Sequence, residues 1–130
     1  FYVPTLPRDT MNDRITHTPN LSWAQLFHFP GNAEVKVLRD EGPGEAMTLL
    51  VRLPPGGQIR PHSHPAPVQH YVLEGTYESE GDTFHAGTYR FIVERKVVAT
   101  LTTTTGALIL MIYDPVTLPP SEVGSSKRTA

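Results

Sequence analysis

Short apolar runs separated by proline and glycine most strongly constrain what this chain can fold into. The 130 residues include 13 prolines and 10 glycines, and these fall between the apolar runs. Proline lacks a backbone N–H, and both residue types interrupt regular structure. The pattern therefore disfavours long helices and favours short strands joined by turns. We predict an all-β fold of about nine or ten strands, arranged as a sandwich or a barrel.

The predicted strands are segments rich in β-branched and other apolar residues. They cover residues 34–39, 47–53, 58–64, 68–73, 76–80, 83–85, 89–93, 97–103 and 107–113. A chain of this length fits one domain. We predict an N-terminal arm over 1–20, a β-barrel over 21–115 and a mobile C-terminal tail over 116–130.

Composition excludes several classes of function. The formal net charge is −2, and the basic residues are scattered, so we expect no nucleic-acid partner. No apolar run approaches the roughly 18 to 20 residues of a membrane span, so we expect no membrane partner either. The chain has no cysteine, which excludes disulfides and thiolate metal sites and is compatible with the predicted cytoplasmic location. It begins with Phe1, so we expect it to belong to a longer native or processed chain, and a removed signal peptide stays compatible with the sequence.

Residues 56–75 carry the pattern with the most chemical content. Gly56 is followed after five residues by His62-Ser63-His64, and a predicted strand then ends at Gly75. Alternate residues of a strand point to the same side, roughly 7 Å apart along the backbone. Two imidazoles placed in this way can converge on one divalent ion. We predict His62 and His64 as a metal-binding pair; the alternative is that they are ordinary polar residues at a strand end.

This segment resembles the first motif of the cupins, G-x5-H-x-H-x3/4-E-x6-G, in both glycines and both histidines. The glutamate of the motif is replaced by Val68 or by Gln69, depending on the spacing. The chain is most similar to the short single-domain cupins, which include β-diketone-cleaving and dihydroxyacetophenone-type dioxygenases and anti-sigma cupin domains. The resemblance implies a single-domain jelly-roll β-barrel, and cupins often pair as homodimers, which we expect here.

The second cupin motif, G-x5-P-x-G-x2-H-x3-N, is not matched. When it is anchored on Gly87, its later positions fall on Val93, Arg95, Val98 and Thr102. The last histidine ligand of the family is therefore replaced by Val98, which cannot bind a metal. Three explanations stay open: a different third ligand, a metal-free barrel that binds an organic ligand, or a strand shifted from this alignment.

His70 is the best substitute for the missing ligand, because it has the same parity as the histidine pair and is predicted to face inward. Otherwise it is hydrogen-bonded to substrate or water, or is a core histidine. Gln69 would take its place if the preceding turn bulged by one residue, since a bulge reverses the parity of the residues after it. Arg60 shares the face of the pair and either orients an anionic or enolate oxygen or lies at the barrel rim. Tyr89 and Arg90 are expected to be ordinary strand residues.

These observations favour a metal-dependent enzyme that acts on a small carbonyl or enolisable compound. Three imidazoles, from His62, His64 and His70, suit one divalent transition metal, Fe, Zn, Ni or Cu. The first hypothesis is a dioxygenase that cleaves a diketone-like substrate, in which the metal stabilises an enolate oxygen and His70 or a bound water handles the proton. The alternatives are a non-catalytic ligand-binding or regulatory cupin with a degenerate metal site, and a Zn-type isomerase or cyclase.

Overall fold

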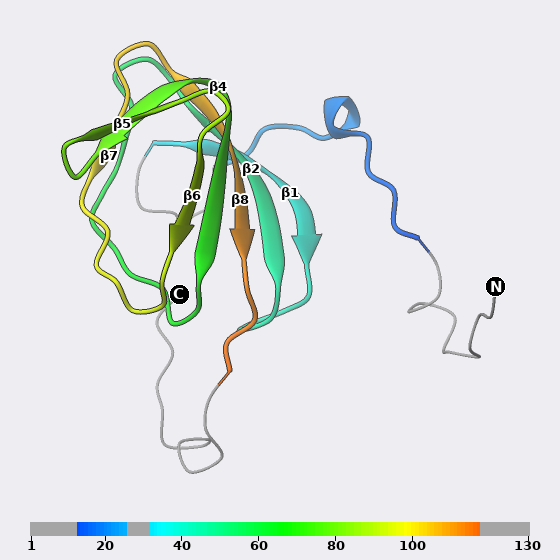
Figure 1. Cartoon of the computed structure of the whole chain (residues 1–130). Helices are drawn as coiled ribbons and strands as arrows, with labels where there is room; N and C mark the ends of the chain where they lie inside the picture. The colour runs from blue at the N-terminus through cyan, green and yellow to red at the C-terminus, as the bar shows by residue number, and fades with distance from the viewer. Residues whose placement is uncertain (1–12, 26–31, 118–130) are drawn as a thin grey trace.

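The regular elements of the described chain, residues 13–25 and 32–117 of a computed structural model, are almost all β-strands (Figure 1). A short 3-10 turn, η1 (Thr18–Asn20), precedes them. The strands are β1 (Glu34–Asp40), β2 (Met47–Leu53), β3 (Gln58–Ile59), β4 (Val68–Ser79), β5 (Asp82–His85), β6 (Tyr89–Ile92), β7 (Leu101–Thr102) and β8 (Ala107–Tyr113). The prediction of an all-β fold is confirmed. No helix in these residues is long and apolar enough to cross a membrane.

The strands form two antiparallel sheets that share one strand. One sheet has the order β1-β2-β8-β4-β6, and the other joins β3, β7, β4 and β5. Strand β4 takes part in both, so the sheet curls over itself (Figure 1). Alternate residues of β2 and β8 point into the space between the two sheets. There Leu49 is paired with Met111, and Val51 with Ile109. This enclosed face is where the candidate site lies.

A β-bulge in β4 carries the strand from one sheet to the other. The register with β8 shifts between Val72 and Glu74, and Gly75 follows with φ +72°. A Cβ built on Gly75 would overlap the carbonyl oxygen of Gly106, so only glycine fits this approach. Before the bulge the even-numbered residues of β4 are buried; after it Tyr77 and Ser79 are. The bulge therefore reverses which side chains face inward.

Two of the predicted strands are shorter than expected, and two others form a single continuous strand. The segments 58–64 and 97–103 contain only the two-residue strands β3 and β7, plus an isolated bridge between His62 and Val98. Pro61 and Pro65 flank the histidines and have no N–H to donate, which limits strand pairing there. The strands predicted over 68–73 and 76–80 form the single strand β4, because the bulge bends the chain at Gly75 without ending the pairing.

The end of the predicted N-terminal arm and the first residues of the predicted barrel, residues 18–24, pack on the outer face of β1 and β2. Two cations lie over the ring of Trp23: the Lys36 Nζ atom is 4.7 Å from the ring centroid, and the guanidinium carbon of Arg52 is 4.0 Å from it. Lys36 also donates a hydrogen bond of 2.7 Å to the carbonyl of Thr18. Residues 1–12 of the predicted arm and 118–130 of the predicted tail lie outside the described residues.

Candidate functional site

The structure brings His62 and His64 together, as the sequence predicts. Their ring centroids are 4.9 Å apart and the ring planes meet at 79°. Both side chains are partly buried. The backbone of His62 exchanges two hydrogen bonds with Val98, of 3.2 and 2.8 Å. Because directly paired residues present their side chains on the same face, Val98 lies beside His62, and it is 1% exposed. The position aligned with the missing cupin histidine is therefore adjacent to the pair.

The ring of His62 is oriented by a backbone carbonyl. Its Nδ1 lies 2.7 Å from the carbonyl oxygen of Arg60. A carbonyl oxygen can only accept, so Nδ1 donates, and in the neutral imidazole the lone pair is left on Nε2. Metal-binding histidines are commonly fixed by a bond of this kind. The side chain of Arg60 is exposed, so Arg60 contributes its carbonyl group to the site.

His64 is held neutral at pH 7 by its surroundings. Burial, and then the nearby charge of His62, lowers its pKa to about 4. Its ring packs edge-on against Tyr113, with centroids 5.1 Å apart. Burial raises the pKa of Tyr113, so this phenol stays protonated. His64 therefore offers a neutral imidazole, the form that a metal requires.

His70 faces inward, as its parity predicts, and is 4% exposed. It lies on β4 opposite Arg90 of β6 and Met111 of β8. Burial lowers its pKa to about 3, and the positive charges of Arg90, His62 and His64 act in the same direction.

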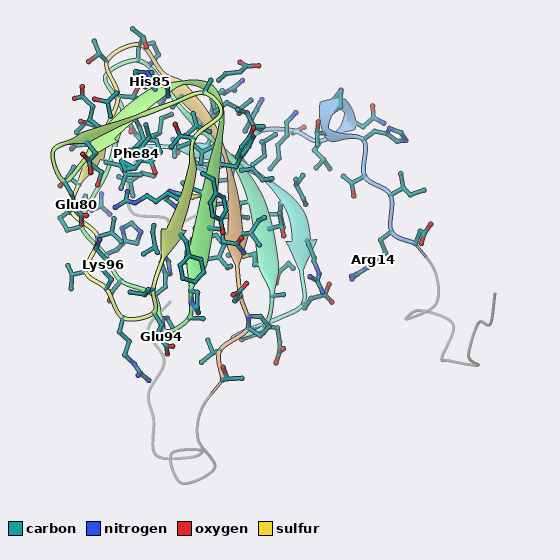
Figure 2. All side chains as sticks on the ribbon, in the orientation of Figure 1. Arg14, Glu80, Phe84, His85, Glu94 and Lys96 are labelled. Carbon is teal, nitrogen blue, oxygen red and sulfur yellow. The ribbon has the colours of Figure 1, made fainter. Side chains whose placement is uncertain are left out.

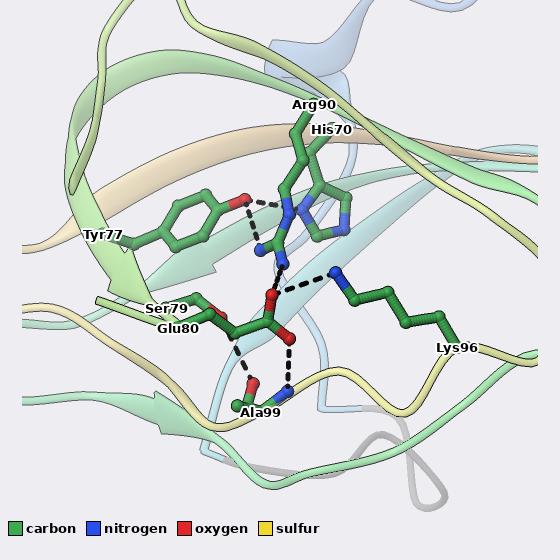
Figure 3. Close-up of polar contacts among 7 residues, drawn as sticks. All are labelled: His70, Tyr77, Ser79, Glu80, Arg90, Lys96 and Ala99. Atoms are coloured by element: carbon green, nitrogen blue, oxygen red, sulfur yellow. Dashed lines mark hydrogen bonds and ion pairs between the residues drawn. The ribbon is translucent and has the colours of Figure 1, made fainter. Parts of the chain in front are cut away.

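A directed hydrogen-bond chain connects Arg90, Tyr77 and His70 (Figure 3). Nη1 of Arg90 donates to the Tyr77 hydroxyl at 3.5 Å, and that hydroxyl lies 2.9 Å from Nδ1 of His70. A guanidinium cannot accept a hydrogen bond, so within the described residues the phenolic proton has Nδ1 of His70 as its acceptor. His70 then carries its own proton on Nε2. This arrangement makes His70 a hydrogen-bond donor toward the barrel interior.

Glu80 connects the Arg90–Tyr77–His70 hydrogen-bond chain to Lys96 and Ala99. It lies in the two-residue turn between β4 and β5, with φ +56°, and Gly81 follows with φ +82°. Its Oε1 accepts from Arg90 Nη2 at 3.3 Å and from Lys96 Nζ at 3.0 Å, and its Oε2 accepts from the backbone N–H of Ala99 at 3.3 Å. These contacts keep the pKa of Glu80 low, with the Lys96 hydrogen bond as the largest cause. One ionised carboxylate thus serves two cations.

Gln69 does not face the histidines. It alternates with the inward-facing Val68 and His70, and its Oε1 accepts a 2.6 Å hydrogen bond from the Tyr89 hydroxyl on the outer side of the sheet. Gln69 would face inward only if a bulge before β4 reversed the alternation of the strand. The bulge of β4 comes later, after Val72, so Gln69 keeps its outward orientation.

The structure adds Tyr77 and Arg90 to the predicted candidate site. Arg90 was expected to be an ordinary strand residue, but its side chain is only 10% exposed and faces inward beside His70. Arg90 and the buried Ile92 are alternate residues of one strand, and this spacing indicates that both side chains face inward. Tyr77 has no such signal in the sequence, because its inward orientation depends on the bulge at Gly75.

The donor set fits a metal only in part. In residues 13–25 and 32–117, no group of three or more His, Asp or Glu side chains is arranged to hold a metal ion. The neutral imidazoles of His62 and His64 suit a divalent transition metal in type and spacing. His70 would join them as a ligand only if its proton moved from Nε2 to Nδ1.

Comparisons with known proteins agree with this architecture. The sequence profile of the ChrR cupin-like domain matches residues 11–117. The chain superimposes on an acetylacetone dioxygenase from Acinetobacter johnsonii with a TM-score of 0.69 and 16% identity, covering 87% of this chain and 79% of that one. It superimposes on the polyketide cyclase RemF from Streptomyces resistomycificus with a TM-score of 0.66 and 18% identity, covering 89% of this chain and 94% of that one.

The anti-sigma protein ChrR, solved in complex with SigE from Rhodobacter sphaeroides, has a TM-score of 0.63 and 23% identity, covering 75% of this chain and 52% of that one. No curated protein matches the chain. At these identities the structural likenesses show the fold, and the neighbours include both enzymes and a regulator.

Proposed function

Since this chain belongs to the family of ChrR cupin-like domains, we propose that its barrel interior binds a small carbonyl compound beside one divalent transition metal. His62 and His64 would hold the metal. The observation that carries this proposal is the orientation of His62, whose Nδ1 donates to the Arg60 carbonyl and leaves Nε2 free next to the His64 ring. Two imidazoles suit Fe, Zn, Ni or Cu.

His70 has two candidate roles in this proposal, as third ligand or as proton-handling residue. The chain from Arg90 through Tyr77 favours the second role, because it leaves His70 with an N–H on Nε2. A buried neutral imidazole in this state donates a hydrogen bond to a substrate oxygen without charging the interior. The ligand role stays a prediction.

A bound metal would supply Lewis-acid stabilisation of an enolate oxygen. The remaining chemistry falls to the chain itself. The apolar side chains around the site, including Val98 and Met111, are buried and keep bulk water away from a bound substrate. His70 and Arg90 present N–H groups from neighbouring strands to an oxygen in the interior. This combination suits a substrate that develops negative charge on oxygen, such as a diketone or a hydroxyketone.

The metal content of the purified protein tests the proposal. Protein purified without chelators, then incubated with Fe, Ni, Cu or Zn, should retain about one equivalent of metal; retention well below one equivalent of every metal would refute the proposal. His62→Ala and His64→Ala should each abolish retention. The matched control is His85→Ala, since His85 is an exposed histidine on β5 outside the site. Metal retention unchanged in His70→Ala would remove His70 from the ligand set.

A non-catalytic ligand-binding or regulatory domain is the second candidate. It is favoured by the buried Val98, which occupies the place next to His62 where the resemblance expects the last ligand. A protein that takes up no metal but still binds small carbonyl compounds would support it. Oxygen uptake with a simple β-diketone separates the two metal-dependent alternatives, because a dioxygenase consumes O₂ and a Zn-type isomerase or cyclase does not.

The homodimer expected from the sequence stays a proposal. Size-exclusion chromatography with light scattering would check it: twice the 14.4 kDa chain mass supports a dimer, and a single chain mass contradicts it.

A further inference from the structure

The Arg90 guanidinium is a buried cation with an incomplete set of partners. Its side chain is 10% exposed. Within the described residues its polar contacts are the Tyr77 hydroxyl at 3.5 Å and a Glu80 oxygen at 3.3 Å. Both distances exceed the roughly 2.9 Å of a well-formed charge-assisted hydrogen bond. A guanidinium has five N–H donors, so these contacts leave donor capacity unused.

The buried guanidinium of Arg90 shares its carboxylate partner with a second cation. Glu80 is shared between Arg90 and Lys96, and its second oxygen accepts from the backbone of Ala99. Of the two cations, Arg90 is the one that solvent compensates least, since its side chain is 10% exposed against 43% for Lys96. A buried charge without full compensation is costly, and an anion of single charge would balance it.

The position of Arg90 favours a ligand inside the barrel. Arg90 lies directly opposite His70 across the β4–β6 pair, and its guanidinium carbon is 4.7 Å from the ring centroid of Phe84. The aromatic contact and the Tyr77 hydroxyl fix the plane of the guanidinium. Lys96 is more open, with 43% of its side chain exposed, and Figure 2 shows Glu80 and Lys96 on the side of the barrel away from Arg14. The buried fork, and not the exposed ammonium, is suited to specific recognition.

We propose that Arg90 recognises a carboxylate, and that the ligand of the barrel interior is a small carbonyl compound bearing one carboxylate group. The planar fork of Arg90 matches the two oxygens of a carboxylate, and the Nε2 hydrogen of His70 is left for the carbonyl oxygen of the same molecule. This inference rests on the proposed function and narrows its substrate class from carbonyl compounds in general to monoanionic oxo acids.

A matched pair of probes tests the inference by isothermal titration calorimetry at pH 7.5. Acetoacetate and acetylacetone have nearly the same shape and differ in a carboxylate against a methyl ketone. The wild-type protein, without added metal, should bind acetoacetate about 10- to 100-fold more tightly than acetylacetone, the difference expected for a charge-assisted pair. Equal binding of the two probes, or binding of neither, overturns the inference.

Variants assign the preference to Arg90. Arg90→Gln should abolish the preference, and Arg90→Lys should keep part of it, since the charge remains but the fork is lost. Glu80→Gln should tighten acetoacetate binding by releasing both cations, so the inference also predicts a gain that an unfolded variant cannot imitate. Lys96→Gln, which removes the exposed cation of the same group, should change the preference less than threefold. A preference retained by Arg90→Gln, with native circular dichroism, refutes the assignment.

The two proposals fail separately. Selective acetoacetate binding by a protein that takes up no metal would sustain the role of Arg90 and refute the metal site. Normal metal uptake with equal binding of the two probes would do the reverse.

Discussion

Replacing Val98 by histidine should create the third imidazole that the site lacks. Val98 and His62 exchange both backbone hydrogen bonds, so their Cα atoms are about 5.5 Å apart and their side chains share one face. A histidine at position 98 would therefore place its ring beside His62, within reach of a metal held by His62 and His64. We expect metal affinity to rise by about 10- to 100-fold, comparable to the effect of a well-placed ligand-supporting group.

The same change should destabilise the metal-free protein. Val98 is 1% exposed, and a larger, polar ring there overpacks the core at a cost of about 1 to 3 kcal/mol. Metal binding to the folded state opposes this loss, contributing about 2.7 kcal/mol when the free metal is 100 times the Kd. The melting temperature of Val98→His should thus fall without metal and return close to the wild-type value with excess Zn²⁺.

Zinc titration calorimetry and thermal unfolding with and without Zn²⁺ measure both effects. The matched control is Val97→His, which makes the same substitution one residue away on a side chain that is 69% exposed. The control should change neither metal affinity nor stability. If Val98→His folds and binds Zn²⁺ no more tightly than the wild type or the control, then position 98 does not adjoin a metal site and the placement of the His62–His64 pair as ligands is wrong.

Three further predictions concern the fold around the site. Tyr77→Phe should lower the free energy of unfolding by about 1 to 3 kcal/mol in urea titrations, because His70 and Arg90 each lose a buried partner; a loss below about 0.5 kcal/mol would contradict the hydrogen-bond chain. Gly75→Ala should cost more than Gly81→Ala, since both have positive φ but only at Gly75 does a Cβ collide with a backbone oxygen; equal losses of unfolding free energy would argue against the close approach. Burial lowers the pKa of His70 from its ordinary value of 6.5 to about 3. Below pH 6.5, His70 therefore binds a proton in the unfolded chain but not in the folded one. Stability should therefore fall as the pH drops from about 6.5 to 5, with up to about 1.4 kcal/mol per pH unit from His70 and a separate contribution from His64, whose pKa is also lowered. A slope in His70→Gln equal to that of the wild type would refute the contribution of His70.

Local patterns determined the fold class and the position of the histidine pair. The predicted strands over 47–53 and 107–113 coincide with β2 and β8, because a short apolar run bounded by proline and glycine turns favours a buried strand. The His-x-His spacing placed His62 and His64 together, since neighbouring alternate residues need little more than an extended backbone to share a face. The inward orientation of His70 followed from the same alternation.

The surroundings of the histidines were decided by tertiary structure. Tyr77 reaches His70 only because the bulge before Gly75 reverses the parity of β4, and a bulge of this kind depends on the facing turn at Gly106. Arg90 faces His70 through pairing between β4 and β6, which no local pattern specifies in register. The sequence by itself thus determined an all-β barrel that carries a close histidine pair. The charges, tautomers and hydrogen-bond donors around that pair arise from contacts between distant strands, which only the folded chain brings together.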